Sequence, residues 1–74
     1  MTGIEHRLMY GTGLRRYATV KPHSRHRDLW VWFLPDGRVA RDPLSLPRAK
    51  AEAEAIMCRM PQLDPAKFRW VEVP

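Results

Sequence analysis

DLWVWFLPDGRVAR, residues 28–41, carries the clearest structural signal of this chain. Residues 29–34 are apolar without interruption and rich in aromatic and β-branched side chains, which is typical of a β-strand. Pro35-Asp36-Gly37 suits a three-residue turn, because proline presets φ and glycine accepts the left-handed conformation. We therefore predict a β-hairpin in which residues 38–41 form a short return strand.

The strand at residues 29–34 is apolar on both of its faces. Because successive side chains of a strand point in opposite directions, it presents two sets of residues: Leu29, Val31 and Phe33, and Trp30, Trp32 and Leu34. One set should face a helix, together with Ile56 and Met60, and the other should lie on the outer face or beneath the N-terminal segment. The sequence leaves open which set is which. Two tryptophans on the outer face would form an apolar patch suited to a partner.

The helix is expected between Ser45, which can serve as its N-cap, and Pro61, which ends it. Pro47 is tolerated in the first turn, where its missing N–H has no helical partner to lose. Apolar residues follow at three- and four-residue spacing and predict one buried stripe: Leu46, Ala49, Ala53, Ile56, Met57 and Met60.

Two more strands complete the predicted fold. Residues 14–21 have β-favouring side chains, and FRWVEV at residues 68–73 alternates in character. The prediction is an α+β fold, a small antiparallel sheet of three to four strands in β-β-β-α-β order with one helix packed on one face. Residues 1–74 are expected to form a single small domain, with residues 1–13 as a flexible N-terminal segment.

The positive charge of the chain is concentrated in its first half. The formal net charge is +5, and residues 1–41 hold eight Arg and Lys against three Asp and Glu, whereas residues 42–74 hold five of each. Cations on one surface can contact phosphates, and aromatic rings can stack on bases. The candidate residues for binding nucleic acid or a partner are Arg15, Arg16, Tyr17, Lys21, Arg25, Arg27, Trp30, Trp32, Arg38 and Arg41.

The sequence does not predict catalysis. A carboxylate pair for acid–base chemistry cannot be assembled, because Asp36 and Asp64 are explained by turns. Glu52 and Glu54 are expected on the solvated side of the helix, four residues after Arg48 and Lys50. We expect a protein that is not an enzyme.

Metal and cofactor binding are not expected either. His23 and His26 lie three residues apart in a predicted loop, but nothing in the sequence brings His6 or Cys58 near them. Recognition-helix, zinc-finger and RNP signatures are absent from the sequence, and the helix has a mixed charged face that makes it unsuited to the major groove.

The stretch from the tryptophan strand through PDGR to SLPRAKAEAEAIM, roughly residues 28–60, resembles small hairpin-plus-helix proteins of phages and mobile elements. The resemblance implies a compact α+β module with a binding role, often against a host machine, and it assigns no functional residue. Two hypotheses follow. The first is a basic, non-enzymatic module that binds nucleic acid or a nucleic-acid-handling complex. The second is a phage-type regulator or inhibitor that docks on a host protein machine, with Trp30 or Trp32 as anchors. The machine would be, for example, an RNA polymerase or a CRISPR effector, and in the latter case the protein would be an anti-CRISPR.

The compartment is expected to be the cytoplasm, that of the host cell if the protein is phage-encoded. Apolar runs long enough to span a bilayer, and the apolar region of a signal peptide, are missing from the sequence. The single cysteine, Cys58, fits a reducing compartment. A membrane partner is not expected, and the protein should be a monomer or a small homo-oligomer.

Overall fold

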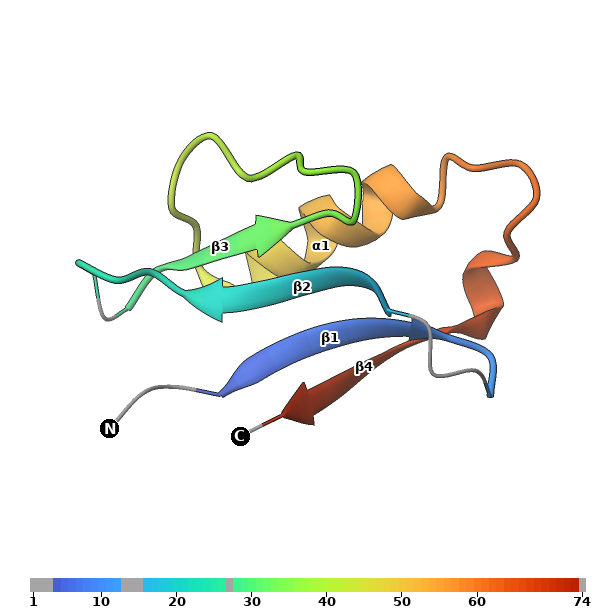
Figure 1. Cartoon of the computed structure of the whole chain (residues 1–74), viewed down its shortest axis with the longest axis horizontal. Helices are drawn as coiled ribbons and strands as arrows, with labels where there is room; N and C mark the ends of the chain where they lie inside the picture. The colour runs from blue at the N-terminus through green and yellow to red at the C-terminus, as the bar shows by residue number, and fades with distance from the viewer. Residues whose placement is uncertain (1–3, 13–15, 27, 74) are drawn as a thin grey trace.

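The computed structural model describes residues 4–12, 16–26 and 28–73, which form one antiparallel sheet and one helix (Figure 1). The elements are β1 (Glu5–Tyr10), β2 (Arg16–Pro22), β3 (Trp30–Phe33), α1 (Leu46–Met57), the short 3₁₀ helix η1 (Pro65–Lys67) and β4 (Phe68–Val73). The strand order is β3-β2-β1-β4, and every neighbouring pair is antiparallel. The predicted fold class, a small antiparallel sheet with one helix on one face, is confirmed.

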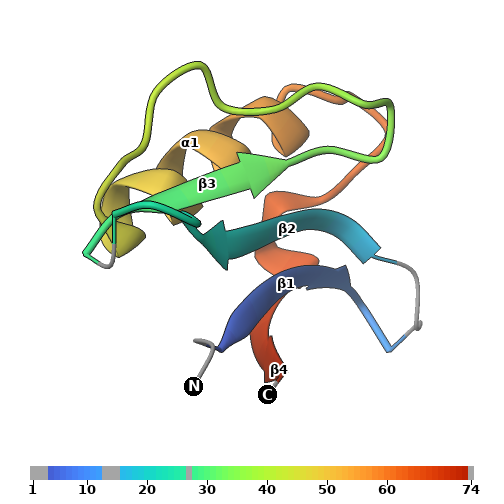
Figure 2. The ribbon, with the colours of Figure 1, turned by 60° about the vertical axis from the view of Figure 1, so that its left-hand side comes forward.

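Helix α1 packs against β2 and β3 on one face of the sheet, which we call the inner face (Figure 2). Its fully buried residues Ala49 and Ala53 are small, so the helix backbone can lie close to the strands. The core consists of Leu8, Ala18, Val20, Trp32, Leu34, Ala49, Ala53 and Met57. Ile56 and Met60, predicted in the core, are half-buried at its margin.

The tryptophan set of β3 faces the helix, which settles the alternative that the sequence leaves open. Trp32 is only 8% exposed, and its indole Nε1 donates a hydrogen bond of 3.2 Å to Oε1 of Glu52. The indole of Trp70 on β4 donates in the same way to Glu54, at 3.1 Å. Both glutamates therefore serve the indole N–H groups, rather than only facing solvent as predicted.

Trp30 also faces the inner side of the sheet and is half-buried. It packs edge-on against the ring of His6, with 5.2 Å between ring centroids. Of the two arrangements that the sequence leaves open, the one with a tryptophan patch on the outer face does not occur, because Trp32 lies in the core and Trp30 packs against it.

The prediction of a flexible N-terminal segment over residues 1–13 is wrong for Glu5–Tyr10, which form β1. This strand lies between β2 and β4 and pairs with both. Its side chains alternate: His6 and Leu8 are buried on the inner face, while Glu5 and Arg7 lie on the other face. The order β-β-β-α-β holds, but β1 supplies the first strand.

The predicted return strand at residues 38–41 is also wrong. Val39 forms an isolated bridge with Phe33, and Leu44 forms another with Trp30. Four residues separate Val39 from Leu44, whereas two separate Trp30 from Phe33, so a continuous ladder cannot form. The segment therefore follows the edge of β3 through scattered hydrogen bonds, such as the one from Ala40 N to Trp32 O at 3.0 Å.

The turn that begins this segment has the conformation expected from the sequence. Gly37 has φ of 95°, and its N–H donates to the carbonyl of Leu34 at 3.1 Å. The next bond, from Leu34 N to Arg38 O at 2.8 Å, closes the turn.

Gly37→Val should lower the free energy of unfolding by about 1–2 kcal/mol, because a β-branched side chain disfavours positive φ. A Cβ at this position would meet no atom within 4 Å, so the effect should be conformational rather than steric. Gly37→Asn is the matched control, since asparagine tolerates this region better and should lose less. Denaturant unfolding measures both variants, and equal midpoints for Gly37→Val and the parent would contradict the assigned turn.

Candidate functional site

The face of the sheet opposite α1, which we call the outer face, carries a groove. Residues directly opposite in an antiparallel ladder share a face. The register therefore places Val71, Arg7, Thr19 and Phe33 in one row across β4, β1, β2 and β3. The groove, here the outer groove, has a volume of about 570 Å³ and is lined by Arg7, Met9, Arg16, Ala18, Thr19, Lys21, Phe33, Leu34 and Pro35.

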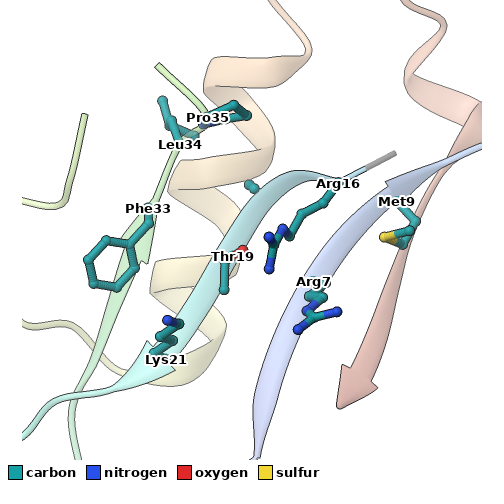
Figure 3. A pocket seen from close by; sticks show the side chains of 9 residues that line it. Arg7, Met9, Arg16, Thr19, Lys21, Phe33, Leu34 and Pro35 are labelled. Atoms are coloured by element: carbon teal, nitrogen blue, oxygen red, sulfur yellow. The ribbon is translucent and has the colours of Figure 1, made fainter. Parts of the chain in front are cut away.

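The two sides of the outer groove differ in chemistry (Figure 3). Phe33 and Pro35, on and after β3, give one side an apolar wall. Arg7 on β1 and Arg16 on β2 give the other side a basic wall. Thr19 is buried and lies on β2 between them, so the floor of the groove is formed by the middle strand.

Glu5 organises the cations of this face. Its Oε2 accepts hydrogen bonds from Nε of Arg7 and, at 3.5 Å, from Nη1 of Arg16. Its Oε1 lies 3.8 Å from Nζ of Lys21. Among the residues that the structure describes, three cations thus surround one carboxylate, and this cluster, here the Glu5 cluster, has two positive charges in excess.

The Glu5 carboxyl is held in its charged form. The hydrogen bond from Arg7 lowers its pKa, burial acts in the opposite direction, and the charges of Arg7, Lys21 and Arg16 lower the pKa further. The site is therefore a group of cations that already binds an anion, and that anion belongs to the protein itself.

Lys21 links the two walls of the groove. Its Nζ lies 5.6 Å from the centroid of the Phe33 ring and also pairs with Glu5. Phe33 is 37% exposed, and the ammonium group lies over its aromatic ring.

Two of the ten predicted binding residues line the outer groove, and two others are not described by the structure. Arg16 and Lys21 line the outer groove and belong to the Glu5 cluster. Arg15 and Arg27 lie outside the residues that the structure describes. The predicted basic run thus contributes two cations to the described site.

Three other predicted cations lie in loops. Arg25 is exposed between β2 and β3, and its backbone N–H donates to Nδ1 of His23 at 3.0 Å. Arg38 is exposed after the turn and pairs with Asp36 through Nε and Oδ2 at 2.7 Å. Arg41 is exposed in a bend before α1. Neither Arg25, Arg38 nor Arg41 lines the outer groove.

The predicted aromatic residues do not line the groove. Trp30 and Trp32 pack on the inner face, as described above. Tyr17 is half-buried and contacts the rings of Tyr10 and Phe68 edge-on, with centroids 5.6 and 5.9 Å apart. It follows that the exposed aromatic side chain of the site is Phe33, which the sequence analysis did not select.

Arg7 and Glu5 were missed as well. The signal for this strand is weak, because EHRLMY runs from three polar to three apolar or aromatic residues and shows no period of two in polarity. Only the strand geometry places Glu5, Arg7 and Met9 together on one face.

The histidines do not contribute to the outer groove. His23 and His26 contact each other in the loop after β2, with ring centroids 5.0 Å apart. His6 is buried on the inner face, and burial, with a smaller contribution from the charge of Lys50, lowers its pKa, so it is neutral at pH 7.

Comparison with protein-family models, curated proteins and solved structures finds no match to this chain. Within the described ranges, the structure contains no helix that is long and apolar enough to cross a membrane. The geometry and charge of the outer groove therefore indicate its function.

Proposed function

We propose that this protein is a small, basic, non-enzymatic module that binds nucleic acid, or a complex that handles nucleic acid, through its outer groove. The observation that supports the proposal is the Glu5 cluster, in which Arg7, Arg16 and Lys21 lie on one open sheet face around a single carboxylate. Cations spread over one surface are the arrangement that phosphate contacts require.

The donors of the cluster suit phosphate in particular. Two of the three cations are arginines, whose planar guanidinium groups can donate two parallel hydrogen bonds to one phosphate. A bound phosphate would accept hydrogen bonds from the same arginines as the carboxylate of Glu5, either beside it or in competition with it. Because the surface remains positive with Glu5 charged, it attracts an approaching polyanion.

The alternative function, docking on a host protein machine, relied on Trp30 or Trp32 as exposed anchors. Both side chains pack on the inner face, so this alternative has lost the residues that were expected to supply its binding energy. Direct contact with nucleic acid is the hypothesis that the outer groove favours.

Arg16→Gln should weaken oligonucleotide binding and reduce its dependence on salt. Loss of one phosphate contact should lower the slope of log affinity against log salt by about 0.7–0.9, roughly equally for all sequences. Titration of a labelled oligonucleotide at several salt concentrations measures the slope.

Arg48→Gln is the matched control, because Arg48 is exposed on α1, which packs on the other face of the sheet. It removes the same charge from the protein and should leave the slope nearly unchanged. Equal changes for both variants would mean that the total charge, and not the outer groove, controls binding.

A further inference from the structure

The outer groove has walls of two kinds, and this pairing points to the chemistry of its occupant. Phe33 and Pro35 offer apolar surface, and Val39, 52% exposed, is bridged to Phe33 and extends it. The opposite wall carries Arg7 and Arg16. A nucleotide combines a flat, largely apolar base with an anionic phosphate, so it can satisfy both walls at once.

Phe33 is placed to receive a base rather than to fill the core. It lies on the outer face, opposite α1, and more than a third of the residue is exposed. The ammonium group of Lys21 lies over the ring, so a base stacked there would replace it and leave its charge free to neutralise the phosphate of the same nucleotide.

The width of the sheet favours a single strand over a duplex. Four strands spaced by about 4.8 Å make a surface about 14 Å wide. The major groove of B-DNA is about 12 Å wide and admits a helix or a two-stranded ribbon, so a four-stranded sheet is too wide to enter it. In a duplex the bases are stacked on each other, so their flat faces cannot reach Phe33, whereas those of a single strand can.

We propose that the outer groove binds single-stranded nucleic acid, with a base stacked on Phe33 and the adjacent phosphates held by Arg7 and Arg16. This inference rests on the proposed function, since it specifies the form of nucleic acid that the groove accepts. Phe33 supplies sequence-tolerant stacking, and the arginines supply the salt-dependent part of the affinity.

The test is the binding of a single-stranded oligonucleotide and a duplex of matched length to the parent and to three Phe33 variants, at about 150 mM salt. Phe33→Ala and Phe33→Leu should each weaken single-strand binding by about tenfold, because neither side chain is aromatic. Phe33→Trp should bind the single strand about as tightly as the parent. Duplex affinity and the salt slope should stay unchanged. Circular dichroism establishes that the variants are folded.

The possible outcomes separate the two proposals. If Phe33→Leu binds as tightly as the parent, or if single strand and duplex bind equally, stacking is overturned, while a reduced slope for Arg16→Gln would still support phosphate binding. If neither oligonucleotide binds more tightly than about 10⁻⁴ M, both proposals fail. Preferential binding of poly-glutamate would assign the groove to an acidic protein and would also overturn the inference.

Discussion

Leu8→Ala is expected to lower the free energy of unfolding by about 3–5 kcal/mol. Leu8 is fully buried on β1 and lies directly opposite Ala18 on β2 and Trp70 on β4. The neighbouring core residues Ala18, Ala49 and Ala53 are too short to fill the space that a missing isobutyl group would leave. A domain of this size has a total free energy of unfolding of only about 4–11 kcal/mol, so the variant should lose a large part of its stability.

Met9→Ala is the matched control for Leu8→Ala, because Met9 is the next residue of β1 and lies half-buried on the outer face. Its loss should be about 1 kcal/mol or less, as is usual for side chains away from the core. Denaturant unfolding, followed by tryptophan fluorescence, measures both variants. A loss below about 1 kcal/mol for Leu8→Ala would mean that β1 is not an integral strand of the sheet.

The fold class could be predicted from the sequence because its strongest signals are local. The uninterrupted apolar run at residues 29–34, the turn at Pro35-Asp36-Gly37 and the apolar stripe of α1 each depend on residues close in the chain. Strand β1 escaped because one of its inward residues is His6, whose polar character hides the alternation. The segment after Gly37 has short-range strand character but lacks a register that could extend the ladder.

The candidate site could be predicted only in part, since its make-up depends on which face of β3 is covered. The two faces of residues 29–34 are similarly apolar, so hydrophobicity does not distinguish them. The tryptophan face is the one that is covered, and there Glu52 and Glu54, which are distant in the sequence, accept hydrogen bonds from the indole N–H groups of Trp32 and Trp70. Buried indoles need such partners, and pairings of this kind are not visible in a local pattern.

The second large effect is a gain of function at Glu5. If phosphates bind the Glu5 cluster, Glu5→Gln removes a competing negative charge and should tighten oligonucleotide binding by about three- to fivefold near 150 mM salt. Glu5→Lys adds a further cation and should tighten binding by on the order of tenfold or more. Losing these partly exposed ion pairs should change stability little.

A gain is more informative here than a loss, because a misfolded variant can lose affinity but does not acquire a tighter and more salt-dependent interaction. Glu72→Gln is the matched control, since Glu72 is exposed on β4 and shares the inner face with its register partner His6. It removes an equal charge from the same sheet and should leave affinity nearly unchanged.

The most direct test of a phosphate-binding outer groove is the affinity of Glu5→Gln for a single-stranded oligonucleotide, measured against salt concentration beside the parent protein. We predict tighter binding at every salt concentration up to about 150 mM and a slope steeper by about 0.7–0.9. Unchanged or weaker binding by folded Glu5→Gln, with the parent slope, would contradict the assignment of this face to nucleic acid.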